Sequence, residues 1–343
     1  MSLDFLVGFT IFMLALIMVV SMVPGLLAGL DSSGIDYDAV AYRTGVILVE
    51  DPGWPVYPPW EMNDGDHKDE IQRIGLAASK DTPNILLSTK VEKFFEAGFF
   101  DQDDYRSKAI FGDIPYSYNF SLSSGGTLIG QTGDPLPLGY GYGYIRRVVK
   151  IKEPGVAVIN GTFAPQYTSL SSNQEFIVRL DFSKLLDPSV GAAYRIDPRT
   201  EPVNVTITDF GAYRNITSPP DDNATLKTVT FWKKDPTRPI PQFTRIPFAY
   251  GTTDSELYTL YIDGNPKNLT PGVEVDENIS LVLKPAATSL FTLDQNSILD
   301  IRFNFEDADY PHTNITDIHH YDYNMTNVTR PDLKAGVLEV AIW

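Results

Sequence analysis

The stretch FLVGFTIFMLALIMVVSMVPGLLAGL, residues 5–30, decides the fold, because it carries no charged side chain over 26 positions. As a helix rising about 1.5 Å per residue, it would be roughly 39 Å long. That exceeds the roughly 20 residues needed to cross a bilayer core, and in lipid such a run must be helical. The sequence therefore predicts a long apolar N-terminal helix, residues 1–32, that lies in a membrane.

Three roles for this helix compete. No Lys or Arg precedes Arg43 and the apolar run is long, which argues against a cleaved secretory signal. A plain membrane anchor and a helix that later packs against copies of itself both stay open. Small residues allow close helix approach, Pro24 permits bending, and the Asp4 carboxylate can pair with a neighbouring subunit's terminal amine. The candidate assembly residues are Asp4, Phe5, Gly8, Pro24, Gly25 and Gly29.

Residues 33–110 lead outward from this helix. The polar stretch DSSGIDYD at 31–38 leaves the apolar layer, and residues 39–50 are compatible with a continuing helix. Four prolines between residues 51 and 59 predict a loop. The amphipathic stretches IQRIGLA and TKVEKFFEAGFF then predict short helices near 65–100, whose apolar residues pack in a core.

Beyond residue 110 the apolar pattern has a period of two, as in Phe176, Val178 and Leu180. Short alternating runs separated by turn residues predict a mainly antiparallel, sandwich-like β domain over residues 111–343, with two subdomains as an alternative. Further strands are predicted at 143–152, 154–163, 202–210, 226–233, 256–263, 274–284, 299–305 and 334–343.

Composition narrows the class of protein. The net charge of −17 makes nucleic acid and anionic lipid headgroups unsuitable partners. The absence of cysteine excludes disulfides, thiolate zinc sites and cysteine nucleophiles. A chain of 343 residues with 43% apolar content can bury one large core or two modest ones.

Sequons for N-glycosylation are the second strong signal. Ten of the chain's 16 Asn residues lie in an Asn-X-Ser/Thr sequon. With 48 Ser and Thr among 343 residues, about two such sequons are expected by chance. Glycans need exposed attachment points, so these positions should mark the solvent face of the β region. The candidate glycosylation sites are Asn119, Asn160, Asn204, Asn215, Asn223, Asn268, Asn278, Asn314, Asn324 and Asn327.

Signals for catalysis or cofactor binding are weak. Three of the four histidines, His312, His319 and His320, lie among carboxylates at residues 305–323, but their spacing matches no defined metal site. No nucleophile elbow, phosphate loop or dinucleotide fingerprint is present, and GYGYGY at 139–144 has the wrong glycine spacing. We therefore expect no enzyme activity, no cofactor and no dedicated metal site.

The N-terminal run SLDFLVGFTIFMLALIMVV resembles the N-terminus of archaeal type IV pilin-like proteins. The resemblance implies a short basic leader removed ahead of the apolar helix, and an acid at the fifth mature position. Asp4 matches that acid but falls one position early if Met1 is the first mature residue. The following stretch AYRTGVILVEDPGWP, from residue 41, is similar to the segment after the helix in some of these proteins.

The sequence thus predicts a structural subunit of an archaeal extracellular pilus-like filament. The resemblance implies a membrane-inserted precursor, a homo-polymer formed through the N-terminal helix, and an outer β region carrying N-linked glycans. The alternative is a glycosylated surface protein, held by a single membrane helix, that does not polymerise, such as an adhesin or an envelope-binding accessory protein. A tethered hydrolase or sugar-binding protein is a third and less favoured class.

Overall fold

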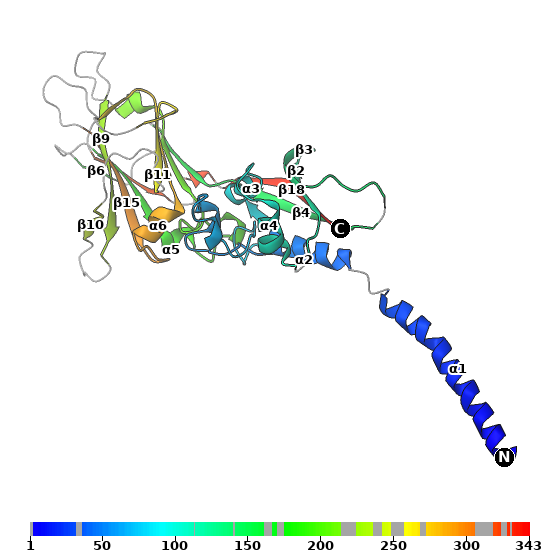
Figure 1. Ribbon diagram of the computed structural model, residues 1–343. Helices are drawn as coiled ribbons and strands as arrows, with labels where there is room; N and C mark the ends of the chain where they lie inside the picture. The colour runs from blue at the N-terminus through cyan, green and yellow to red at the C-terminus, as the bar shows by residue number, and fades with distance from the viewer. Residues whose placement is uncertain are drawn as a thin grey trace.

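A computed structural model of the chain shows a helix that projects from a β-rich body (Figure 1). Helix α1 runs from Leu3 to Asp31, and helix α2 from Tyr37 to Glu50 follows it at the edge of the body. The structure describes residues 3–31, 36–112, 114–139, 141–160, 167–169, 175–213, 224–235, 242–247, 257–267, 272–305, 318–323, 328–329 and 331–343, and describes side chains in α1 only over residues 7–21.

Asp36 caps the N-terminus of helix α2, because its carboxylate accepts a hydrogen bond from the Ala39 backbone nitrogen at 3.0 Å. Its buried face packs on a five-stranded sheet, and the contact is close. A side-chain carbon on Gly45 would lie 3.0 Å from Ile145, and one on Gly143 would overlap the Tyr37 carbonyl oxygen. Glycine at these two positions therefore lets the helix and the sheet approach each other.

This five-stranded sheet joins distant parts of the chain. Strand β18 lies at its centre between β4 and β2. The last strand of the chain therefore belongs to the same sheet on which α2 packs. In sheet order the strands are β1 (Ile85–Leu87), β4 (Gly143–Lys152), β18 (Leu333–Ile342), β2 (Tyr118–Ser124) and β3 (Thr127–Gly133).

Short helical turns cover the region between α2 and β2. They carry aromatic residues that pack with α2 and the five-stranded sheet into a first hydrophobic core. This core draws residues from both sides of position 110, where the sequence suggested a boundary. The turns are η1 (Trp60–Met62), η2 (Lys68–Glu70), α3 (Ser88–Phe94), α4 (Gln102–Tyr105) and the π-helical η3 (Arg106–Ile110).

A second core lies between two further sheets that pack face to face. Phe176, Val178 and Leu180 of one sheet meet Val203, Val205 and Ile207 of the other within one buried cluster. One sheet contains β10 (Phe243–Arg245), β9 (Ala224–Lys234), β15 (Ile298–Phe305), β7 (Glu175–Asp181), β16 (Ile318–Tyr323), β6 (Tyr167–Ser169) and β13 (Val273–Val275), which pairs with β9. The other contains β12 (Asn265–Pro266), β11 (Tyr258–Ile262), β14 (Ile279–Leu283), β8 (Val203–Ile207), β5 (Val156–Ile159) and β17 (Val328–Thr329).

Short helices also accompany the second core. They lie in the connections between its strands and close its ends with buried residues such as Phe182, Phe210 and Ala287. These helices are α5 (Phe182–Leu185), η4 (Ala192–Tyr194), η5 (Phe210–Tyr213) and α6 (Pro285–Leu290).

The predicted fold class, a long apolar helix followed by a mainly antiparallel sandwich-like domain, is wrong for the described residues. Each of the three sheets is mixed, because β1 pairs with β4, β16 with β7 and β5 with β8 in parallel. In the part of the chain that the structure describes, no helix has the length and apolarity needed to cross a membrane.

The positions of many strands were nevertheless predicted correctly. The predicted strand at 143–152 coincides with β4, and those at 299–305 and 334–343 lie within one residue of β15 and β18. The period of two identifies these strands because one side of each packs in a core. The parallel pairings were missed, because alternation within a strand carries no information on its partner's direction.

A buried ionisable pair lies in the first core. The Lys90 ammonium donates to the backbone oxygens of Pro52 at 2.5 Å and Ala77 at 3.3 Å. Burial lowers the pKa of Lys90, and the carboxylate of Glu61 raises it in part. Burial likewise raises the pKa of Glu61 above its ordinary value, against the opposing effect of Lys90.

Glu61 predicts a pH dependence of stability. Because its pKa is raised in the folded state, the folded chain binds the proton more tightly, and stability decreases as pH rises above about 4.3. We expect the Glu61→Gln variant to gain stability relative to the parent between pH 4 and 7, measured by urea unfolding. Glu70→Gln, which removes a charge from an exposed position, is the control. A Glu61→Gln difference that stays constant over this range would contradict the expectation.

Candidate functional site

The described segment of α1 exposes apolar side chains in every direction. Large apolar residues at positions 7, 9, 11–14 and 16–20 are each between 38% and 69% exposed. Successive residues of an α-helix are turned by about 100°, so residues 16–20 alone point to all sides of the axis. Figure 1 shows α1 extending away from the body that α2 joins. The body therefore does not cover this surface.

Such a surface requires a cover from outside the chain. A helix that is apolar all round is normally buried in a protein core or a membrane. Each Leu, Ile, Phe or Met side chain left in water forgoes about 1.5–3 kcal/mol of burial free energy. Lipid or other copies of α1 can supply the missing contacts, and both were expected from the sequence.

The predicted assembly residues lie on this helix. Gly8 is exposed, and a side-chain carbon added to it would meet no atom within 4 Å. Packing within the chain therefore does not require a glycine there. The structure does not describe the side chains of the other predicted assembly residues of α1, which are Asp4, Phe5, Pro24, Gly25 and Gly29.

The predicted glycosylation sites are distributed unevenly. Asn160, Asn204 and Asn278 are half-buried at the end of β5, within β8 and just before β14. Asn119 on β2 is only 6% exposed, which departs from the expectation that every sequon lies on the solvent face. The remaining sites, Asn215, Asn223, Asn268, Asn314, Asn324 and Asn327, lie outside the described residues.

The Asn119 amide is fully engaged. Its Nδ2 nitrogen, the atom that a glycan would modify, donates to the Asp134 backbone oxygen at 2.7 Å. Its Oδ1 oxygen accepts from Gln131 Nε2 at 3.2 Å. Strand β3 and the residues that follow it therefore occupy the space that a sugar at Asn119 would need.

We expect Asn119 to be unmodified and Asn278 to be glycosylated in protein from the native cells. The physical reason is that Asn119 Nδ2 already donates to the Asp134 backbone oxygen, and a glycan on this nitrogen would need space that β3 and the residues after it occupy. Mass spectrometry of glycopeptides tests both sites, with Asn119→Gln and Asn278→Gln as variants. Only Asn278→Gln should change the electrophoretic mobility of the protein, and a sugar found on Asn119 would refute the expectation.

The histidine-rich segment divides into two parts. Residues 306–317, with His312, lie outside the described residues. His319 and His320 belong to β16 and are buried, and the His319 ring stacks on Phe176 with centroids 4.8 Å apart. Burial lowers the pKa of His320, and Arg179 lowers it further. These two histidines thus contribute to the second core rather than to an exposed loop.

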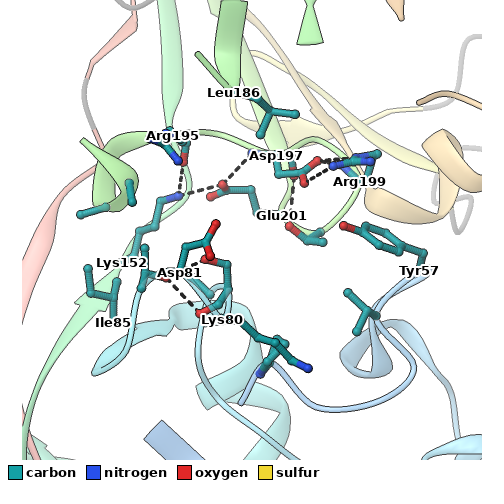
Figure 2. A pocket seen from close by; sticks show the side chains of 18 of the residues that line it. Tyr57, Lys80, Asp81, Ile85, Lys152, Leu186, Arg195, Asp197, Arg199 and Glu201 are labelled. Carbon is teal, nitrogen blue, oxygen red and sulfur yellow. Dashed lines mark hydrogen bonds and ion pairs between the residues drawn. The ribbon is translucent and has the colours of Figure 1, made fainter. Parts of the chain in front are cut away.

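A pocket of about 660 Å³ lies between the two cores (Figure 2). The Pro-rich loop with Trp54 and Tyr57 and the turn at residues 78–85 line it from the first core. The connection at residues 186–201 lines it from the second. Sequence reasoning missed this pocket, although the aromatic residues Trp54 and Tyr57 among the prolines were a visible signal.

A buried ion pair joins the two cores beside this pocket. Lys152, the last residue of β4, is 2.7 Å from Glu201 Oε1, and both side chains are almost fully buried. The Lys152 ammonium also donates to the Arg195 backbone oxygen at 2.6 Å. Glu201 Oε1 accepts a second hydrogen bond from the Asp197 backbone nitrogen at 2.9 Å. Figure 2 shows this network on one side of the pocket.

A second polar pair lies at the pocket entrance. Arg199 donates from Nε and a terminal nitrogen to the two carboxylate oxygens of Asp197, at 2.9 and 2.8 Å. Its guanidinium lies 5.0 Å from the centre of the Tyr57 ring, within the range of a cation–π contact. Burial raises the pKa of Tyr57, as does the neighbouring Asp197 charge. The Tyr57 ring is thus held in place by a charged pair of the second core.

Comparison with known proteins gives one match. A family model described as a family of unknown function (DUF7287) matches residues 1–55. That segment contains α1, α2 and the first residues of the Pro-rich loop. No curated protein and no solved structure gives a significant match.

Proposed function

We propose that this chain is a structural subunit of an archaeal type IV pilus-like filament, polymerising through α1. The observation that carries the proposal is the exposure of apolar side chains on all sides of residues 7–21. A membrane anchor needs only an apolar helix, whereas a polymer also needs copies of that helix to pack against one another. The resemblance of the N-terminal run to archaeal pilin-like proteins favours the polymer.

The connection to the body supports this proposal. Buried residues of α2 pack on the five-stranded sheet, and Arg43 of α2 donates to the Ile110 backbone oxygen at 2.9 Å. Glu50, the last residue of α2, pairs with Arg147 of β4 at 2.6 Å. The body is thus fixed to α2, the helix that follows α1 in the sequence, and residues 32–35 between the two helices lie outside the described residues.

Assembly would follow from the apolar surface. The membrane covers α1 in the precursor, and copies of α1 cover one another in the filament. A contact between two different faces of the same chain, repeated without closure, builds a helical fibre. The β-rich body with its glycans then forms the outer surface, and its net charge of −17 favours solubility.

The test is electron microscopy of material sheared from cells that produce the chain, with mass spectrometry to identify its components. Uniform filaments that contain the chain are the expected result. Chain found only in the membrane fraction, with no filaments, would overturn the proposal. That second result would favour the alternative of a membrane-anchored surface protein that does not polymerise.

A further inference from the structure

The pocket between the two cores has no role in filament assembly as proposed. Two aromatic side chains that line it are unusually accessible, since Trp54 is 48% and Tyr57 is 55% exposed. Large aromatic rings provide apolar contact area, and a pocket of 300–1,000 Å³ is typical of small-molecule sites. With about 660 Å³, the pocket is large enough for a ligand that covers these rings.

Contacts within the protein hold the Trp54 backbone and the Tyr57 ring before any ligand binds. The Trp54 backbone nitrogen donates to the Arg73 backbone oxygen at 2.8 Å. The Trp54 backbone oxygen accepts from the Gln72 backbone nitrogen at 3.1 Å. Tyr57 lies against Arg199, which is held in turn by Asp197. A site whose side chains are already ordered loses little conformational entropy on binding.

Most of the charges around the pocket have partners, and the exposed Lys80 and Asp81, which also line it, are of opposite sign. This balance of charge argues for an uncharged ligand. Lys152 pairs with Glu201, and Arg199 pairs with Asp197. Arg195 donates to the backbone oxygens of Val190 and Pro188, each at 2.9 Å. A strongly ionic ligand would therefore have to compete with these existing partners.

Hydroxyl and carboxylate groups provide the remaining polar contacts. Ser79 and Thr82 line the pocket with their hydroxyl oxygens 2.9 Å apart, and Thr200 also lines it. A second cavity of about 280 Å³ shares Tyr57 and Arg199 with the first and contains Thr288. Two cavities that share an aromatic ring fit a ligand with repeated units.

We propose that this pocket binds an uncharged oligosaccharide, with one sugar unit in each cavity and Tyr57 between them. Sugar rings present flat C–H faces that pack on the Trp54 and Tyr57 rings. Their hydroxyl groups both donate and accept hydrogen bonds, which suits the Ser, Thr and carboxylate groups around the pocket. A peptide would instead need unpaired backbone partners along its length. The site would let the filament surface bind a glycan.

The experiment uses the full chain purified in detergent on an array of neutral and acidic oligosaccharides, followed by calorimetry with the best ligand. We expect neutral oligosaccharides to bind, and Tyr57→Ala to weaken binding about tenfold or more. Trp54→Ala is a second variant with the same expected direction. Tyr42→Ala is the matched control, because Tyr42 on α2 is 57% exposed but does not line the pocket.

Three results would overturn the proposal. The wild-type chain binds no oligosaccharide at millimolar concentration, it binds only acidic ones, or Tyr57→Ala and Trp54→Ala bind as tightly as Tyr42→Ala. Binding of a peptide library at the same pocket without any sugar binding would also count against it. None of these outcomes depends on whether the chain forms filaments, so this test is separate from that of the proposed function.

Discussion

A Leu14→Asp substitution is expected to abolish filaments while leaving the body folded. Leu14 lies in the described segment of α1 and is 63% exposed. If copies of α1 bury this side chain, a carboxylate there would be placed in an apolar contact without a partner. Electron microscopy of sheared material should then show at least about a tenfold loss of filaments.

The matched control for this prediction is Leu290→Asp. Leu290 is also a leucine at 63% exposure on a helix, but it ends α6 on the body. We expect that variant to form filaments as the wild type does. Cell fractionation gives a second readout. If the Leu14→Asp variant is found in the membrane fraction but forms no filaments, it has lost assembly and kept membrane insertion. Wild-type filament yield from Leu14→Asp would contradict a role for α1 in polymerisation.

Breaking the buried ion pair between Lys152 and Glu201 should reduce the unfolding free energy more than breaking an exposed ion pair does. Lys152→Met would leave Glu201 buried beside the Asp197 backbone nitrogen with no cation. Removing one partner of a buried pair typically costs about 3–5 kcal/mol of unfolding free energy. Replacing both, as Lys152→Met with Glu201→Leu, should recover most of this loss, because neither charge of this pair is then left without its partner.

An exposed pair of the same chemistry is the control. Lys334 lies 3.1 Å from Glu153, with side chains 53% and 37% exposed. Lys334→Met should cost no more than about 1 kcal/mol, as surface ion pairs do. Chemical denaturation measures the unfolding free energy of the wild type, of Lys152→Met, of the double variant and of Lys334→Met. Equal costs for Lys152→Met and Lys334→Met would show that the buried pair does not stabilise the junction of the cores.

The sequence by itself determined the local features of this protein. The uncharged run at residues 5–30 predicted a helix, and α1 extends from Leu3 to Asp31. The alternation of Phe176, Val178 and Leu180 located β7, because every second residue of a strand points to the same side. Sequons and prolines were likewise readable, since each depends on neighbours within a few residues.

Only the tertiary structure decided which distant residues meet. The parallel pairing of Ile85 with Lys150, the burial of Asn119 under β3, and the pocket formed where Tyr57 meets Arg199 depend on residues far apart in the sequence. A single chain's periodicity specifies which face of a strand is buried. It does not specify the partner strand or its direction, because long-range pairing depends on how whole layers pack.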